Sequence, residues 1–202
     1  MNASYAVQCV VAIIAVATWF CFSAFAAPVY TYGGGFDLAI PGPDDPDSQY
    51  GRGWMDDAVI EISDHFTIYD LDVVISLTHS KAFDLQIFLH SPAGTYTCLN
   101  MYDLDEYFDG EDYVATIFDD EADIPIELGQ PPFTGRFTPE SSLSVFDGED
   151  TYGLWRLQIY DAYYADTGNL DSFQLMITVL EPATAVLFIL GVALFTLLRP
   201  RR

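Results

Sequence analysis

The stretch GLWRLQIYDAYYADTGNLDSFQLMITV, residues 153–179, decides the fold class of this chain. Within it, the apolar Trp155, Leu157 and Ile159 alternate with mostly polar neighbours, and residues 173–179 repeat the same period of two. A period of two places successive side chains on opposite faces of a strand, so each segment offers one apolar face to a core. The intervening DAYYADTGN contains Asp, Gly and Asn, which favour turns. We therefore expect two strands joined by a hairpin or by a connection between sheets.

Earlier segments of the chain show the same alternation. Residues 57–63, 66–79 and 84–90 each gather apolar side chains on one face, and a Ser-Pro-Ala-Gly turn leads from the last of these into residues 95–101, which predicts a hairpin. The segment PPFTGRFTPE at 131–140 contains three prolines and a glycine, so we expect it to cover a sheet edge. Several short antiparallel strands without an amphipathic helix predict an all-β sandwich.

Composition limits the size and the partners of this fold. The chain has 202 residues, 51% of them hydrophobic, and a formal net charge of -23. This apolar content is enough for one domain with a proper core, so the charge is expected on a folded surface. Such a surface repels the phosphates of nucleic acids and anionic membranes and attracts divalent cations.

Five ordered blocks of sequence carry a resemblance to a known family. They are LTHSKAFDLQIFLHSPAGT at 77–95, TIFDDEA at 116–122, PFTGRFTPESSLSVFDGE at 132–149, GLWRLQIYD at 153–161 and DTGNLDSFQLMI at 166–177. Together they resemble the P domain, or Homo B domain, which follows the subtilisin-like catalytic domain in kexin- and furin-type proprotein convertases. The resemblance implies a jelly-roll-like, galactose-binding-like antiparallel β-sandwich of about eight strands, which in convertases packs on the protease domain and supports its folding. Tyr152, Leu154 and Phe173 depart from the family pattern, which puts a shared surface in doubt but not the fold.

The first half of the chain suggests three successive regions. Residues 1–27 are apolar and end in Ala24-Phe25-Ala26, which is typical of a signal peptide, although the absence of Lys and Arg before the apolar run also fits an uncleaved anchor. Residues 28–53 are rich in Gly, Pro and Asp and are expected to form a leader loop. The P-domain-like sandwich is then expected over residues 54–180.

The C-terminal residues 181–202 combine three features. Glu181-Pro182 precedes an apolar run from Ala183 to Leu198, and the chain ends with Arg199, Arg201 and Arg202. This layout resembles the PEP-CTERM sorting signal of bacterial exported proteins, which implies processing by an exosortase; a plain transmembrane tail anchor is the alternative. Either interpretation predicts an exported protein of the cell envelope or cell surface, with a membrane contact through this segment.

The sequence offers no recognisable catalytic constellation. A serine protease triad needs a histidine with a nucleophile and an acid, but His65, His79 and His90 lie in no such motif and no GxSxG elbow occurs. Carboxylates are numerous, yet none is singled out as a glycosidase pair. Cys98, in a probable strand, is expected to be a small buried side chain. We therefore expect a non-catalytic chain whose link to proteolysis is that of its family.

Two groups of acids are candidate calcium ligands. Asp119, Asp120 and Glu121 follow the expected strand VATIF, and Asp161 and Asp166 lie in DAYYADTGN. Calcium binds carboxylate and carbonyl oxygens in loops, although the same acids would also serve as turn caps.

Two hypotheses of function follow from these observations. In the first, the module binds or stabilises a separate subtilisin-like protease. In the second, it is a matrix or surface protein that binds carbohydrate or protein through acidic aromatic loops such as residues 102–113.

Overall fold

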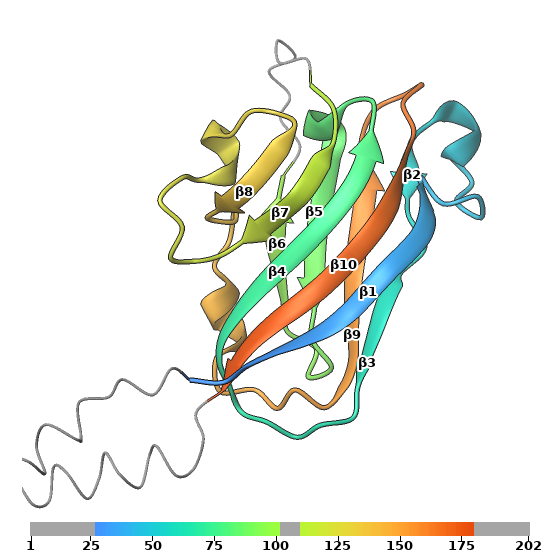
Figure 1. The fold of residues 1–202 in the computed structure, drawn as a ribbon. Coiled ribbons are helices and arrows are strands. Elements are labelled where there is room, and N and C mark those ends of the chain that lie inside the picture. Colours follow the sequence, from blue (N-terminus) through green and yellow to red (C-terminus); the bar gives the residue numbers. More distant parts are fainter. Residues whose placement is uncertain (1–26, 102–109, 180–202) are drawn as a thin grey trace, which may run out of the picture. The chain divides into compact units, whose positions relative to one another are not determined.

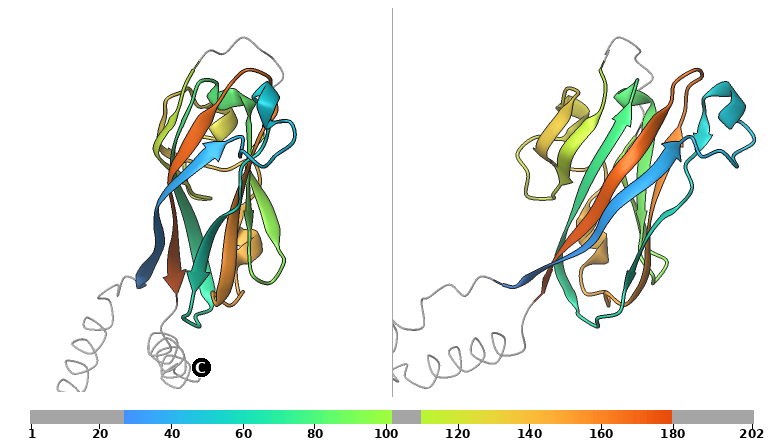
Figure 2. Two further views of the ribbon diagram at one scale, coloured as in Figure 1. Left: turned by 90° about the vertical axis from the view of Figure 1, so that its right-hand side faces the viewer. Right: turned by 45° about the vertical axis from the view of Figure 1, so that its right-hand side comes forward.

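Two β-sheets pack face to face in the computed structural model, which describes residues 27–101 and 110–179 (Figures 1 and 2). Sheet A has the strand order β1-β10-β4-β7-β8, and sheet B has the order β2-β9-β5-β6, with β3 also paired to β9. The strands in these ranges are β1 (Val29–Ile40), β2 (Gly53–Trp54), β3 (Ala58–Ile62), β4 (Ile68–His79), β5 (Leu85–His90), β6 (Tyr96–Asn100), β7 (Tyr113–Phe118), β8 (Phe133–Phe137), β9 (Gly153–Asp161) and β10 (Gly168–Val179). Short 3-10 helices connect some of them, namely η1 (Ser48–Tyr50), η2 (Ala82–Asp84), η3 (Ile126–Leu128) and η4 (Leu143–Phe146). The predicted all-β sandwich is confirmed, with ten strands rather than about eight in the described ranges.

The stretch that predicted the fold spans both sheets. β9 lies in sheet B and β10 lies in sheet A, so the segment between them is the sheet-to-sheet connection. On β9 the side chains of Trp155, Leu157 and Ile159 are fully buried, as their alternation predicts. The Trp155 ring packs edge-on against Phe146 of η4, and its indole N–H donates to the Thr151 carbonyl oxygen at 2.9 Å. The one polar atom of this ring is therefore satisfied inside the core.

The expected leader loop at 28–53 is wrong for its first half. Val29–Ile40 forms the twelve-residue edge strand β1, which pairs antiparallel with β10. Three consecutive glycines concealed this strand, because glycine is rare in strands and breaks the apolar alternation. Gly33 is needed at its position: its φ is 104°, and an added Cβ would lie 2.3 Å from the Phe173 carbonyl oxygen of β10.

One local prediction agrees with the structure, and another agrees in part. β5 and β6 pair as an antiparallel hairpin, closed by a turn in which the Ser91 N–H donates to the Thr95 carbonyl oxygen at 2.8 Å. The proline-rich segment is not a central strand, as predicted, but it does not cover an edge: it forms β8, the outer strand of sheet A, which pairs parallel to β7.

The prediction for Tyr113 is wrong. This residue was expected in the exposed loop, but it is buried at the start of β7, where its ring packs against Phe133.

β1 and β10 lie side by side, so the start of the first described strand and the end of the last one are together at one end of the sandwich (Figure 1). Val29 is paired with Thr178, and the Val179 N–H donates to the Pro28 carbonyl oxygen at 3.1 Å. The expected signal peptide, the sorting segment and most of the acidic loop fall outside the described residues. Among the residues that are described, no helix is long and apolar enough to cross a membrane.

Candidate functional site

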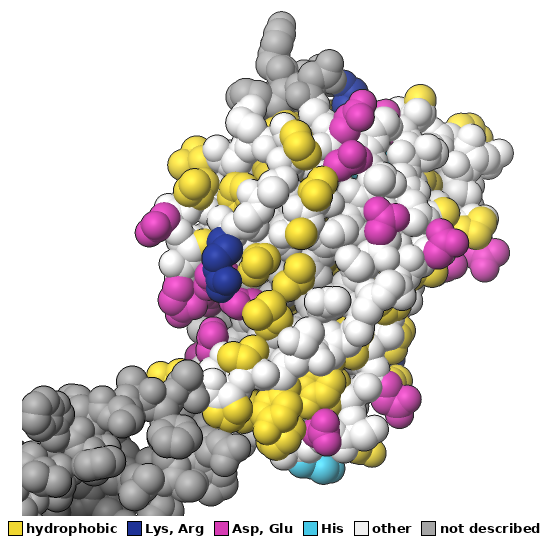
Figure 3. Space-filling view, in the orientation of Figure 1, with side chains coloured by type: hydrophobic (Ala, Val, Ile, Leu, Met, Phe, Trp, Pro, Cys, Tyr) yellow, Lys and Arg dark blue, Asp and Glu magenta, His cyan; other side chains and the backbone are white. Residues whose placement is uncertain are grey.

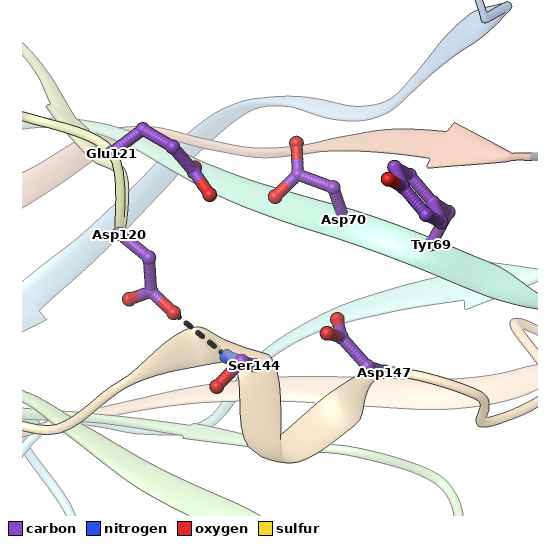
Figure 4. A pocket seen from close by; sticks show the side chains of 6 residues that line it. All are labelled: Tyr69, Asp70, Asp120, Glu121, Ser144 and Asp147. Carbon is purple, nitrogen blue, oxygen red and sulfur yellow. Dashed lines mark hydrogen bonds between the residues drawn. The ribbon is translucent and has the colours of Figure 1, made fainter.

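An acidic pocket opens where the start of β4, the loop after β7 and the η4 segment come together (Figure 4). Its volume is about 300 Å³. The side chains that line it are Tyr69, Asp70, Asp120, Glu121, Ser144 and Asp147. Four of these six are carboxylates, so the pocket concentrates negative charge at one place on an already acidic domain.

Asp120 has a structural role at one wall of this pocket. Its Oδ1 accepts a hydrogen bond from the Leu143 N–H and its Oδ2 accepts one from the Ser144 N–H, both at 2.9 Å. The Ser142 hydroxyl donates to the same carboxylate. Asp120 thus caps the start of η4 from a loop more than twenty residues earlier and joins the two segments.

The other carboxylates of the pocket influence one another. Burial raises the pKa of Asp147, and the charges of Asp70 and Asp120 raise it further. A hydrogen bond with Asp119 raises the pKa of Glu121, and partial burial and the nearby carboxylates act in the same direction. Asp147 and Glu121 are therefore easier to protonate than isolated acids, because burial, hydrogen bonding and neighbouring like charges act in the same direction.

Asp119 adjoins this cluster through its hydrogen bond from the Glu121 N–H at 2.8 Å, and it also joins a charged bridge on sheet A. Arg136 of β8 donates from Nε to Asp119 Oδ2 at 2.6 Å and from Nη2 to Asp72 Oδ2 of β4 at 2.8 Å. Partial burial opposes ionisation of Asp119, but the hydrogen bonds from Arg136 and from the Glu121 N–H outweigh it and lower its pKa. Burial and the Asp119 charge together raise the pKa of Asp72 to about 6, although Arg136 opposes them.

The second predicted group, Asp161 and Asp166, lies near the opposite end of β4. Asp161 Oδ2 is 3.1 Å from His79 Nε2, and both side chains are completely buried. The His79 Nδ1 atom is 2.8 Å from the Lys81 carbonyl oxygen, and Asp166 accepts a hydrogen bond from the Ser80 hydroxyl at 2.8 Å. The two predicted groups are therefore separate, because they contact opposite halves of the long strand β4.

The structure thus gives most of the predicted calcium ligands protein partners. Asp119, Asp120, Asp161 and Asp166 all accept hydrogen bonds from other side chains or backbone groups. Over residues 27–101 and 110–179, no three His, Cys, Asp or Glu side chains are arranged to hold a metal ion. Calcium binding accordingly stays a prediction from the sequence.

Sequence reasoning did not find two of the four carboxylates of the acidic pocket, Asp70 and Asp147, nor its other lining residues, Tyr69 and Ser144. Asp147 begins the acidic turn Asp147-Gly148-Glu149-Asp150, which was a visible signal of an exposed loop. Asp70 sits inside the β4 segment, and nothing in its sequence neighbourhood points to a pocket.

The three histidines occupy different environments. His79 is buried, whereas His65 stacks on Tyr152 and lies 2.8 Å from Asp150, and His90 stacks on Tyr96. In the described part of the chain, none of their hydrogen bonds involves a serine or cysteine side chain. Cys98 is nearly buried, and burial raises the pKa of its thiol to about 11, so it is a poor nucleophile at neutral pH.

The outer face of sheet A is uncharged at its centre. Gly33, Gln174, Val74 and Ile117 lie next to one another across β1, β10, β4 and β7, and the row ends at Arg136 on β8. We call the first four residues the neutral row. In Figure 3 the middle of this face carries apolar and neutral polar side chains, while acidic side chains are more frequent toward its margins.

Comparisons with known proteins give one family and a distant structural likeness. Residues 68–177 match the family model described as proprotein convertase P-domain, whereas no curated protein matches the chain. The structure is similar to that of a serine protease of Aeromonas sobria, with 20% identity over 76% of this chain and 26% of that chain and a TM-score of 0.40. It is also similar to the Aeromonas sobria serine protease in complex with its chaperone, with 18% identity over 77% of this chain and 28% of that chain and a TM-score of 0.39. This chain therefore spans little more than a quarter of the length of either structure.

Proposed function

Because the chain belongs to the proprotein convertase P-domain family, we propose that it is a non-catalytic module that binds and stabilises a partner protein. The partner in this proposal is a separate subtilisin-like serine protease. The observation that carries it is the family match over residues 68–177, since the P domain accompanies such proteases in convertases.

The neutral row is the docking surface in this proposal. Gln174, Val74 and Ile117 are half-buried side chains on a face bounded by acids, in a chain with a net charge of -23. Interface centres are depleted in charged residues and enriched in apolar ones, so the uncharged part of an acidic domain is the part best suited to association. Val74 and Gln174 of the row belong to the long paired strands β4 and β10, whose backbone ladder holds these side chains in place.

Export to the cell envelope or surface completes the proposal. Its support is the composition of residues 1–27 and 181–202, which predicts a signal peptide and an exosortase-processed or membrane-anchored tail. Sequencing the N-terminus of the chain purified from the cell envelope tests the first part, with a start at Ala27 or Pro28 expected. An intact N-terminal segment on envelope protein would contradict cleavage.

Co-expression of the full chain with a subtilisin-like protease from the same source tests the partnership. We expect the two proteins to co-purify and the protease to unfold at a higher temperature with the chain than without it, since a ligand that binds only the native state stabilises it. Val74→Glu, which puts a charge in the neutral row, should weaken co-purification at least tenfold. The matched control is Val59→Glu on the exposed side of β3, which should bind as the wild type does.

The outcomes distinguish two questions: whether the chain binds the protease, and whether the neutral row is the interface. If wild-type chain and protease neither co-purify nor affect each other's melting temperature, the proposed function is wrong. If they associate but Val74→Glu and Val59→Glu bind equally well, the neutral row is not the interface.

A further inference from the structure

A strip of aromatic side chains lies at one end of the outer face of sheet B, on a different sheet from the neutral row. It begins at β2, where Trp54 is paired with Tyr160 of β9, and Tyr160 is paired in turn with Gln86 of β5. The inward-facing neighbours Ile159 and Ile87 are fully buried, so these paired side chains point outward. We call the following residues the aromatic strip: Tyr50, Arg52, Trp54, Phe88, Tyr160 and Tyr164.

The rings of the strip lie close to one another in two groups. The centroid of Trp54 is 4.9 Å from that of Tyr160 and 6.3 Å from that of Phe88. In the second group the rings of Tyr50 and Tyr164 are 6.4 Å apart, nearly perpendicular, and the Arg52 guanidinium lies 4.5 Å from the Tyr164 centroid.

Arg52 belongs to the second group of rings through its contact with Tyr164. The hydrogen bond to Asp47, at 2.9 Å, is the main cause of the raised pKa of Arg52, and both Tyr164 and Tyr160 are near enough to contribute. The guanidinium is therefore held by Asp47 beside the Tyr164 ring, where it stacks on an aromatic face and still donates a hydrogen bond.

The most prominent ring of the strip is exposed and held in place. Trp54 is 43% exposed, while Trp155, the other tryptophan of the described residues, is 0% exposed. The backbone N–H of Trp54 donates to Asp45 Oδ2 at 3.0 Å, and the backbone carbonyl oxygen of Trp54 accepts from the Gly42 N–H at 2.8 Å. A large ring that stays in solvent on a fixed backbone adds little to folding stability, whereas it binds a ligand with little loss of conformational entropy.

The exposed part of the strip extends beyond Trp54. Tyr50 and Tyr164 are 55% and 57% exposed. Polar groups lie beside the rings. Gln86 is half-buried next to Tyr160, and Gln158, two residues from Tyr160 on β9, donates to Asp57 at 2.7 Å. The surface thus combines flat apolar faces with hydrogen-bonding groups around them.

We propose that the aromatic strip binds a neutral polysaccharide. The apolar C–H faces of sugar rings stack on aromatic faces, and sugar hydroxyls pair with amide, guanidinium and carboxylate groups of the kind found beside the strip. Neighbouring ring centroids within each group are separated by 4.9 to 6.4 Å, which is comparable to the length of one sugar unit. Successive units of a linear glycan can therefore stack on neighbouring rings of the aromatic strip.

Charge selects the class of polysaccharide. Asp45, Asp47 and Asp57 border the strip, and Arg52, the one cation among the six strip residues, is already paired with Asp47. An acidic polysaccharide or a nucleic acid would bring further negative charge to a chain of net charge -23 and be repelled. An uncharged glycan meets no such penalty.

The test measures retention of the full chain, purified in mild detergent, on insoluble cellulose and chitin and in native gels that contain soluble xylan or β-glucan. We expect retention on at least one of these neutral polymers and none on polygalacturonate, an acidic one. Trp54→Ala and Tyr164→Ala should each lower the affinity for the retained polymer at least tenfold. The matched control is Tyr152→Ala, which removes a ring of similar exposure, 53%, from outside the strip.

A melting curve of each variant accompanies the binding assay. Loss of binding by a Tyr164→Ala protein that melts as the wild type does supports the strip, because Tyr164 lies in an exposed loop and not in the core. Retention on none of the neutral polymers, or equal retention of the three variants, overturns the proposal. Loss of protease co-purification in Trp54→Ala without any glycan retention also overturns it, and identifies the strip as a protein interface. The Val74→Glu variant leaves the strip intact, so failure of protease binding and failure of glycan binding are distinguishable.

Discussion

His79 of β4 and Asp161 of β9 are hydrogen-bonded across the interior of the sandwich, with Nε2 and Oδ2 3.1 Å apart and neither side chain exposed. The two strands belong to different sheets, so this pair is a polar link between the layers. Burial alone would lower the pKa of His79, but its hydrogen bonds to Asp161 and to the Lys81 carbonyl oxygen raise it overall. A protonated imidazole donates to both acceptors at once, which matches the arrangement.

Removing one partner of this pair should be costly. We expect His79→Ala to lower the free energy of unfolding by about 3 kcal/mol or more, because it leaves a buried carboxylate without its partner. Denaturant unfolding of His79→Ala, Asp161→Ala and the double variant measures the coupling. The control is His65→Ala, whose pair with Asp150 is well exposed and whose loss should change stability little. Equal effects of the buried and the exposed pair would refute the structural role of His79.

Protonation of Asp72 should raise the free energy of unfolding as the pH falls from 7.5 toward 4.5. The folded protein raises the pKa of this carboxyl from 3.8 to about 6 by burial and by the charges of Asp119 and Asp70, against the opposing Arg136. A raised pKa means that the folded state binds the proton more tightly. The resulting stabilisation is present below the unfolded pKa and is lost as the pH rises through 6.

Asp72→Asn tests this dependence, because the amide does not titrate. Relative to the variant, the wild type should lose on the order of 2 kcal/mol of stability between pH 4.5 and pH 7.5. Denaturant unfolding of both proteins at several pH values gives the difference. Parallel stability curves for the two proteins would show that Asp72 titrates normally in the fold.

Gly33→Ala should destabilise the sandwich at the β1–β10 pair. The substitution puts a Cβ 2.3 Å from the Phe173 carbonyl oxygen and 2.7 Å from Ile60 Cδ1, at a backbone φ of 104° that alanine rarely adopts. We expect a loss of about 2 kcal/mol or more in unfolding free energy. Gly34→Ala is the control, since an added Cβ there meets no atom within 4 Å. A similar loss in both variants would mean that strand propensity, and not the contact, is responsible.

Calcium removal tests the metal prediction. If calcium binds the native state, the full chain should melt several degrees higher with calcium than with a chelator. Glu121→Gln, in the acidic pocket, and Asp166→Asn, near the other end of β4, separate the two predicted sites, because only the variant at the occupied site should lose the response. A melting temperature that does not depend on calcium in the wild type would leave the carboxylates as caps, ion-pair partners and surface charges.

Much of the architecture was readable from the sequence because its signals are local. The alternation in β9 and the turn after β5 each lie within a few residues, and both are confirmed. β1 was missed because three glycines interrupt its pattern and its partner β10 is far away in the chain.

The candidate sites depend on contacts between distant segments, which no local pattern encodes. Asp120 caps η4 across 23 residues, and Trp54 stands beside Tyr160 because a strand of only two residues pairs with β9. The two groups of acids predicted as calcium ligands also have partners from distant segments, with Asp119 held by Arg136 and Asp161 by His79.

The hydrogen bond from the Val179 N–H to the Pro28 carbonyl oxygen holds the first and last residues of the sandwich side by side. A domain whose N- and C-termini lie close together can be inserted into a surface loop of a host protein without separating the two sides of that loop. Residues 28–179 therefore form a unit that can be inserted whole into another protein, with β1 and β10 continuing the two strands of a β-hairpin in that protein.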